Sequence, residues 1–237
     1  MGYNINEVAA AGARKLTQLD FIANNLANAS TTGFKSEYLY YAMTGREAQE
    51  GARFDLGMTS TGTDFAQGTL LATGNPLDAA IEGDGFFAIE QNGGTTYTRN
   101  GSFVLNRNKE LVTKDGAKVL GEAGPLILDG AEINIDADGT IMVDGAMAGK
   151  FRIVSFARPD LLTRSASGRF IDDGGAEQKK SDTDRVSGGY LESSNVNAMK
   201  EMVEMIDVNR TFEAYQKIIQ TMSELDKIST NRLGKLA

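Results

Sequence analysis

The side chains whose types and spacing could do chemistry are acidic residues in the middle of the chain. Four residues fall at positions 1, 3, 5 and 6 of a calcium-binding loop: Asn134, Asp136, Asp138 and Gly139. Position 12 of such a loop supplies a bidentate glutamate, and here it is Gly145, with no helix expected on either side. Aspartate followed by glycine is also a strong signal for a hairpin turn. The pattern therefore predicts a turn, and we expect no metal site.

A second acidic group could form the paired carboxylates of an acid–base site, such as that of a carbohydrate hydrolase. Its members are Asp172, Asp173, Asp182 and Asp184. They lie in a stretch rich in glycine and lysine, where carboxylates are usually solvated, and no basic or nucleophilic residue is fixed beside them. Gly83 and Gly85 lack the third glycine and the following helix of a dinucleotide site. We expect no catalytic residue and no cofactor.

The middle of the chain, which must position these residues, is predicted to form short strands between tight turns. Turn signals recur at Asn100-Gly101, Asp115-Gly116, Asp129-Gly130, Asp138-Gly139 and Asp144-Gly145. The strands are expected near residues 84–90, 95–99, 102–105, 118–121, 126–128, 132–135, 140–143 and 151–156. Regular spacing of this kind favours a mainly antiparallel β domain, barrel-like or sandwich-like.

Long amphipathic helices are predicted at the two ends of the chain, over residues 1–28 and 197–228. The first has apolar or small residues at alternating spacings of 4 and 3, as in a coiled-coil seam: Ile5, Ala9, Gly12, Leu16, Leu19, Ala23 and Leu26. The second has spacings of 3 and 4: Met205, Val208, Phe212, Tyr215, Ile219 and Met222. Ile218 and Leu225 widen its apolar face, which favours contact with more than one neighbour. Asn195 or Asn197 could cap its start.

Helices confined to the two ends are unusual in an enzyme and common in a subunit whose ends must find partners. The alternative is that both helices pack on the β domain of their own chain. We expect an α+β fold in which the paired terminal helices form a discontinuous, coiled-coil-like domain. Their packing between molecules is the interpretation we favour.

Composition and charge exclude several classes of function. The 237 residues contain no cysteine, histidine or tryptophan, so disulfides, thiolate chemistry and histidine chemistry are excluded. The net charge is −8, with +1 on residues 1–35, 0 on residues 197–237 and −9 between them. An acidic body with no basic stripe does not suit nucleic acid. We also expect no secretory signal and no membrane span.

Four blocks of sequence then resemble the rod and hook proteins of the bacterial flagellum. They are residues 23–35 (ANNLANASTTGFK), 67–87 (with QGTL, TGNPLDAAI and GDGFF), 97–103 (YTRNGSF) and 191–197 (LESSNVN). They occur in order over nearly the whole chain, and together they are very specific. The chain is therefore identified as a member of the flagellar basal-body rod protein family. Its short length favours the proximal-rod type over the distal-rod type, and hook protein would carry an additional domain.

The resemblance implies a structural subunit that stacks helically, with its terminal helices inside and its β domain outside. It implies a helical assembly domain (1–35 and 197–237), a connecting segment (36–74) and a β-rich outer domain (75–196). The implied partners are copies of the same chain, neighbouring rod proteins and the flagellar type III export apparatus, in a rod that crosses the periplasm. Tyr38, Tyr40, Tyr41 and Phe54 would anchor the connecting segment on adjacent subunits.

The signature also has a physical interpretation. Asn24, Asn25 and Asn28 have amides that could bond carbonyl groups of neighbouring chains, and Gly33 could end the helix with a backbone that other residues avoid. An ordinary helix end with no partner role is the alternative. The predicted assembly interface comprises Leu16, Leu19, Asn24, Asn25, Leu26, Asn28, Gly33, Phe34, Met205, Val208, Phe212, Tyr215, Ile219 and Met222.

Overall fold

The computed structural model describes residues 5–41, 59–91, 93–165, 167–180 and 184–233. The fold is α+β, as predicted, with long helices toward both ends of the chain and antiparallel strands between them. The chain divides into two compact units. The helical unit contains residues 1–27, 37–62 and 197–237, and the β unit contains residues 28–36 and 63–196. The chain therefore passes between the units four times, after residues 27, 36, 62 and 196.

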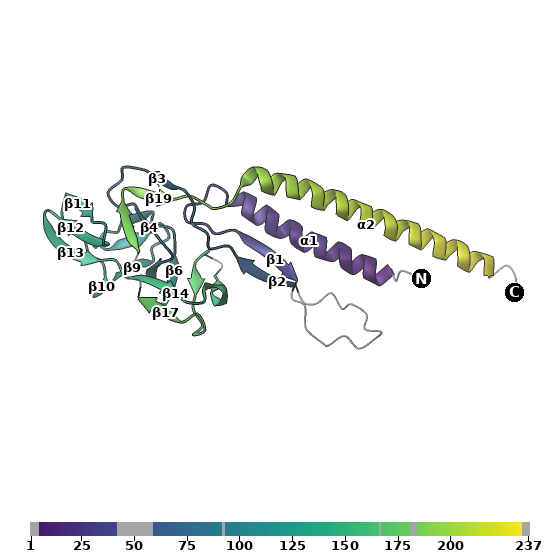
Figure 1. Ribbon diagram of the computed structural model, residues 1–237, viewed down its shortest axis with the longest axis horizontal. Helices are drawn as coiled ribbons and strands as arrows, with labels where there is room; N and C mark the ends of the chain where they lie inside the picture. Colours follow the sequence, from purple (N-terminus) through teal and green to yellow (C-terminus); the bar gives the residue numbers. More distant parts are fainter. Residues whose placement is uncertain (1–4, 42–58, 92, 166, 181–183, 234–237) are drawn as a thin grey trace. The chain divides into compact units, whose positions relative to one another are not determined.

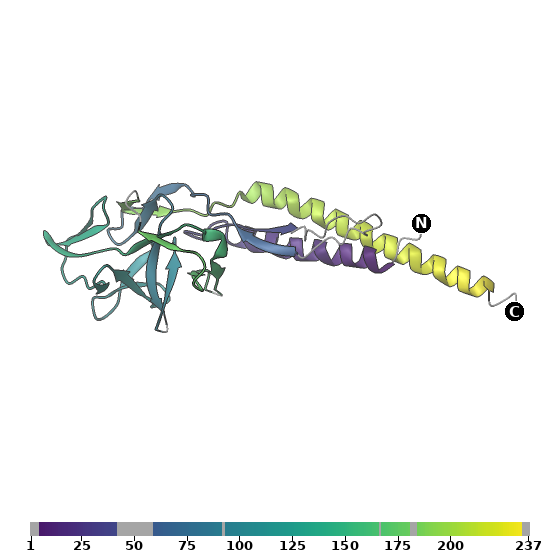
Figure 2. The same cartoon turned by 60° about the horizontal axis from the view of Figure 1, so that its bottom comes forward.

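The helical unit is built on two helices, α1 (Ile5–Ala27) and α2 (Ala198–Leu233), which lie side by side in both views (Figures 1 and 2). Gly12 of α1 faces α2, since a Cβ atom there would make ordinary van der Waals contact with the Cβ of Tyr215, at 3.8 Å. Asn197 caps α2, as one of the two predicted alternatives, by accepting a hydrogen bond of 3.1 Å from the backbone N–H of Lys200.

After α1, the chain forms a two-stranded sheet from β1 (Glu37–Tyr41) and β2 (Thr59–Thr63). Tyr38 and Tyr40 of β1 are exposed, and their rings lie 6.1 Å apart. Phe54, predicted to be an anchor, lies outside the described residues, as does the side chain of Tyr41.

The β unit is assembled from short antiparallel strands. They are β3 (Leu70–Ala72), β4 (Ala79–Glu82), β5 (Phe86–Gln91), β6 (Gly94–Thr98), β7 (Phe103–Leu105), β8 (Leu111–Thr113), β9 (Lys118–Gly121), β10 (Gly124–Pro125), β11 (Ile133–Ile135), β12 (Thr140–Val143), β13 (Ala146–Lys150), β14 (Ile153–Phe156), β15 (Thr163–Arg164), β16 (Phe170–Ile171), β17 (Gln178–Lys180), β18 (Arg185–Gly188) and β19 (Tyr190–Glu192). The largest sheet has the order β15-β16-β6-β5-β9-β8-β7, with β14 also paired to β5. Smaller sheets are β11-β12-β13, β18-β4 and β19-β3.

Successive side chains of β5 point to opposite faces of the sheet, and both faces are buried. Phe87 and Ile89 enter one apolar cluster, whereas Phe86 and Ala88 enter a second. The Phe87 ring is fully buried and meets the ring of Phe103 edge-on, with their centroids 5.2 Å apart. A run of residues buried on both sides is typical of a central strand. The strand therefore determines where both clusters lie.

The predicted turns are partly confirmed. Asp144 and Gly145 have φ of 50° and 80° and join β12 to β13, so this hairpin forms as expected. The hairpin predicted at Asn100-Gly101 is wrong, because β6 and β7 pair with other strands. Gly101 instead passes against the chain at Ala79, where a Cβ atom would overlap the Ala79 carbonyl oxygen.

The strand predicted at residues 126–128 is also wrong. The backbone N–H of Leu126 donates to Val119, whereas that of Leu128 donates to Lys109, so the segment bonds to two different neighbours. It makes an isolated bridge at Ile127 and no continuous ladder. Apolar alternation alone does not distinguish this arrangement from a strand.

The central position of Phe87 predicts a large cost for its removal. Phe87→Ala should lower the free energy of unfolding of the β unit by about 3–5 kcal/mol, because a fully buried ring leaves a cavity. Val104→Ala is the control, since this partly exposed residue of β7 should cost about 0.5 kcal/mol or less. Denaturant unfolding followed by circular dichroism measures both, and equal costs would contradict the assigned core.

Candidate functional site

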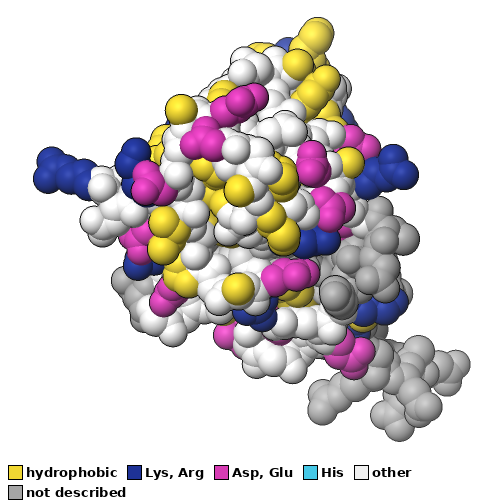
Figure 3. Space-filling model, turned by 90° about the vertical axis from the view of Figure 1, so that its left-hand side faces the viewer, with side chains coloured by type: hydrophobic (Ala, Val, Ile, Leu, Met, Phe, Trp, Pro, Cys, Tyr) yellow, Lys and Arg dark blue, Asp and Glu magenta, His cyan; other side chains and the backbone are white. Residues whose placement is uncertain are grey.

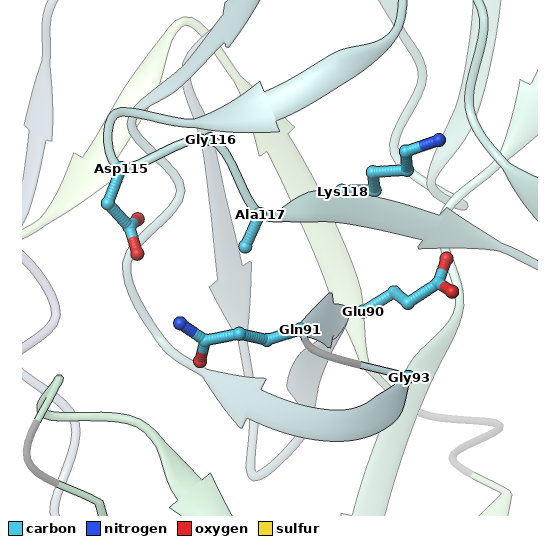
Figure 4. A pocket seen from close by; sticks show the side chains of 7 residues that line it. All are labelled: Glu90, Gln91, Gly93, Asp115, Gly116, Ala117 and Lys118. Atoms are coloured by element: carbon cyan, nitrogen blue, oxygen red, sulfur yellow. The ribbon is translucent and has the colours of Figure 1, made fainter.

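A shallow cavity of about 300 Å³ lies in the β unit (Figure 4). Its lining residues are Glu90, Gln91, Gly93, Asp115, Gly116, Ala117 and Lys118. Burial raises the pKa of Asp115, but hydrogen bonds from Thr113 and Arg169 outweigh this effect and lower it below 3.8. The pKa of Lys118 is raised by its hydrogen bond to Glu110. A carboxylate and an ammonium held in these charged forms are unsuited to proton transfer near neutral pH.

The acidic residues singled out in the sequence serve as turn-forming groups. Asp138 accepts hydrogen bonds from the backbone N–H and hydroxyl of Thr140 and from Lys150, which together lower its pKa to about 2. Asp172 accepts from the backbone N–H groups of Gly174 and Ala176. In the described part of the chain, no three acidic side chains are grouped to hold a metal ion.

The other carboxylates of the suggested acid–base group bond to separate segments. Asp173 accepts from the hydroxyl of Thr163, and Asp184 accepts from the hydroxyl of Ser155 and the backbone N–H of Asp84. Asp182 lies outside the described residues. On the face of the molecule in Figure 3, acidic, basic and apolar side chains are interspersed.

The sequence blocks at residues 33–35, 67–68, 99–101 and 191–195 meet at one place in the β unit. Its centre is Glu192, which is 1% exposed. Glu192 Oε1 accepts from Lys35 Nζ at 2.6 Å and from the Gly68 N–H at 2.8 Å, while Oε2 lies 3.5 Å from Arg99 NH1. We call Lys35, Arg99 and Glu192 the charge cluster.

Both cations of the charge cluster are buried, at 0% exposure for Lys35 and 2% for Arg99. Burial lowers the pKa of Lys35 below its ordinary value of 10.5, and the Glu192 carboxylate opposes that lowering. Arg99 NH2 also donates to the Gly83 carbonyl at 2.6 Å, and the guanidinium lies over the Phe86 ring. A buried cation is tolerated only where such partners are in place, so these contacts fix the geometry closely.

Gly33 and Phe34 complete this region. Gly33 has φ of 67°, and a Cβ atom there would lie 2.5 Å from the carbonyl carbon of Arg99. Its N–H donates to the Glu192 carbonyl at 2.8 Å. Phe34 is buried, and the Arg164 guanidinium lies 4.2 Å from its ring centroid. Gly33 is therefore required both by its dihedral angle and by close backbone packing.

The side-chain amide of Asn25 forms hydrogen bonds within the helical unit. The side chain is 3% exposed; its oxygen accepts from the Glu37 N–H at 2.9 Å, and its nitrogen donates to the Glu37 carbonyl at 2.8 Å. Sequence reasoning missed this pairing. Asn24 is exposed, whereas Asn28 and Leu26 are partly buried, and the Asn28 side chain accepts from the Thr31 hydroxyl.

The seam predicted for α2 lies on its inner side. Val208 is buried and the remaining five residues, Met205, Phe212, Tyr215, Ile219 and Met222, are partly buried. The seam predicted for α1 is partly displaced: Leu19 and Leu26 are partly buried, but Ala9, Leu16 and Ala23 are exposed. Ile22, which the predicted seam omits, is buried. Because many residues of α1 are alanine, the sequence does not define clearly which face of the helix is buried.

A second apolar face of α2 is exposed. Met199, Met202, Val203 and Ile206 lie on the side opposite the seam, given 100° of rotation per residue. Ile218, Leu225 and Ile228 extend exposed apolar surface toward the end of the helix. Among the described residues, no helix is long and apolar enough to span a membrane.

Comparison with protein families gives three matches. Residues 9–35 match "Flagella basal body rod protein", residues 80–143 match "Flagellar hook protein FlgE/F/G D1 domain", and residues 187–233 match "Flagellar basal body rod FlgEFG protein C-terminal". The matched segments contain Lys35, Arg99 and Glu192, one in each segment.

Individual proteins are similar over most of their length. The flagellar basal-body rod protein FlgF of Caulobacter vibrioides is 34% identical, with 92% of this chain and 93% of the relative covered. FlgG of Bacillus subtilis is also 34% identical, with 88% and 90% covered. FlgF of Escherichia coli is 33% identical, with 94% and 95% covered.

Close packing at Gly33 generates a matched test. Gly33→Ala and Gly74→Ala both introduce a Cβ atom at similar φ, 67° and 71°, but no atom lies within 4 Å of the Cβ position at Gly74. The backbone strain alone should cost about 1 kcal/mol in Gly74→Ala. The overlap should make Gly33→Ala cost at least about twice as much. Denaturant unfolding measures both, and equal costs would contradict the close approach.

The lowered pKa of Asp138 generates a test of pH dependence. Between about pH 2 and the ordinary pKa of 3.8, the unfolded chain binds more protons at this carboxyl than the folded chain. Its stabilising contribution is therefore present above pH 3.8 and is lost as the pH falls to about 2. Thermal unfolding should show Asp138→Asn less stable than wild type at pH 5, with the difference shrinking toward pH 2.

Asp129→Asn, in an exposed neighbouring turn, controls for the removal of one negative charge. A deficit in Asp138→Asn that stayed constant from pH 5 to pH 2 would exclude the titration of Asp138 as its cause.

Proposed function

Because the chain belongs to the flagellar basal-body rod protein family, we propose that it builds the rod by helical self-assembly through its terminal helices. The chain is a structural protein and not an enzyme. The proposed assembly domain comprises residues 1–35 and 197–237, and the β-rich domain lies outside it. Contacts that do not close on themselves would extend into a rod that transmits motor torque to the hook.

The observation that carries this proposal is the apolar surface on two opposite sides of α2. One side contacts α1 in the same chain, as the approach of Gly12 to Tyr215 illustrates. The other side, which includes Val203 and Ile206, is exposed. A helix that is apolar on two sides needs two neighbours. We propose that α1 and α2 pair as a coiled coil and that the exposed side of α2 contacts another subunit.

In this proposal the predicted interface residues have two roles. Leu19 and Ile219 would hold the helix pair together, and the exposed Leu16 would extend toward a neighbouring chain. Self-association would then depend on the seam, since the outer face requires a correctly paired helix. Copies of the chain and other rod proteins are the proposed partners, and export through the flagellar type III apparatus would deliver it to the rod in the periplasm.

We propose a proximal position in the rod, because the middle of the chain forms one compact β unit. A distal-rod or hook-type subunit with the same assembly chemistry is the alternative. Relatives named FlgF and FlgG have similar identities to this chain, so identity does not distinguish the two. The axial position of the labelled subunit in isolated basal bodies would do so.

The seam predicts a specific loss of assembly. Ile219→Lys, and likewise Leu19→Lys, should place an ammonium group in the helix contact, where partial burial disfavours a charge. Cells that carry either variant as their sole copy should fail to assemble the rod and should not spread in soft agar. The β unit should remain folded, as measured by amide exchange in the purified chain.

Gln220→Lys is the matched control for Ile219→Lys, because it adds the same charge at the adjacent, exposed position of α2. Cells with this variant should swim normally. Normal swimming of Ile219→Lys, at the expression level of the control, would refute the role of the seam in assembly.

A further inference from the structure

The connections of the β unit to the rest of the chain are made by three of its segments. Residues 28–36 connect at both ends, residue 63 begins the second segment, and residue 196 ends the third. We call these the N-terminal arm (28–36), the middle arm (63–68) and the C-terminal arm (192–196). Every contact described below is within the β unit.

Asn195 joins all three arms through one side chain. Its oxygen accepts from the Ser36 N–H at 2.8 Å, and its nitrogen donates to the carbonyls of Asp64 at 2.8 Å and Ala66 at 3.1 Å. The Asp64 N–H also donates to the Ser36 carbonyl at 2.8 Å. The amide thus satisfies backbone groups that a strand would otherwise satisfy.

Lys35 and Glu192 join the same three arms a second time. Lys35 Nζ donates to the Ala66 carbonyl at 2.8 Å and to Glu192 Oε1 at 2.6 Å. The same carboxylate oxygen accepts from the Gly68 N–H at 2.8 Å. Lys35 and Glu192 are both fully buried. Withdrawal of the N-terminal or C-terminal arm would separate this buried ion pair, and withdrawal of the middle arm would remove one hydrogen-bond partner from each of the two charges. Either loss costs more than the contact itself contributes.

We propose that Lys35, Glu192 and Asn195 form a clamp that docks the three arms together or not at all. Lys35 and Glu192 are 157 residues apart, so the clamp closes a long loop. Such contacts form late in folding, because the entropy of loop closure must be offset first. The N-terminal arm therefore stays undocked until the C-terminal arm arrives, and the clamp makes docking a final folding step. This step is independent of the rod proposal.

Native-state amide exchange of the full chain tests the clamp. Three reporters each bond across two segments: the N–H of Gly33 to Glu192, that of Asp64 to Ser36, and that of Ser193 to Thr69. Asn195→Ala should speed exchange of all three by at least about tenfold, because the arms open together. The amide of Ile89 in β5 should be unchanged. Faster exchange at Asp64 alone would overturn the proposal.

Asn106→Ala is the matched control. This asparagine also makes several local bonds, with the N–H groups of Asn108 and Glu110 and with the Glu110 carboxylate, but it lies outside the arms. It should leave the three reporters at their wild-type rates. Faster exchange of the three reporters in this control would show that a general loss of stability accounts for the result of Asn195→Ala, and it would also overturn the clamp.

Lys35→Met gives a test of cooperativity that does not require removal of the carboxylate. If the arms open as one unit, each substitution lowers the free energy of the same opening, so the Lys35→Met/Asn195→Ala variant should speed exchange at all three reporters by one common factor, larger than in either single variant. Unequal factors at the three reporters would show independent contacts and would refute all-or-none docking. Faster exchange at Ile89 in both the Lys35→Met and the Asn195→Ala variants would show that these residues stabilise the whole β unit. That result would also refute the clamp.

Discussion

Glu192 accepts hydrogen bonds from Lys35 and Gly68 with one oxygen, and its other oxygen faces the guanidinium of Arg99. A buried carboxylate with two cations leaves little freedom to any of the segments that supply them. The arms that lead to the helices are held by this group, so the entry and exit of the β unit depend on it. Asp84 and Asp184 also raise the pKa of Arg99 against the larger effect of burial, which helps to keep the second cation charged.

Much of this architecture was predictable, because it follows from local patterns. Terminal helices, the α+β class and the Asp144-Gly145 hairpin were predicted from periodicity and turn chemistry and agree with the structure. Barrel-like or sandwich-like closure stays a prediction. The errors have physical causes. Gly101 was assigned to a hairpin because Asn-Gly is a common turn dipeptide. In the structure, glycine is needed there because the backbone passes too close to Ala79 for a side chain. The spacing of residue types along the sequence does not indicate where distant segments approach each other closely.

The candidate site was predictable to a different degree. The seam of α2 follows large side chains and lies on its inner side, whereas that of α1 was ambiguous because alanine contributes little to periodicity. Lys35, Arg99 and Glu192 lie within the recognised sequence blocks, but nothing in their local pattern indicates that they are buried together. Charged residues are usually exposed. Their pairing over 157 residues can be found only when the topology is known.

Asn25 and Glu37 have a further consequence for the helical unit. Two hydrogen bonds, 2.9 and 2.8 Å long, bind the last turns of α1 to the first residue of β1 as one strand residue binds another. Packing among small alanine side chains would permit α1 to turn about its own axis, since many rotations present similar surfaces. A directional amide does not permit this. The azimuth of α1, and with it the choice of residues that face outward, is therefore set by polar geometry at one end of the helix.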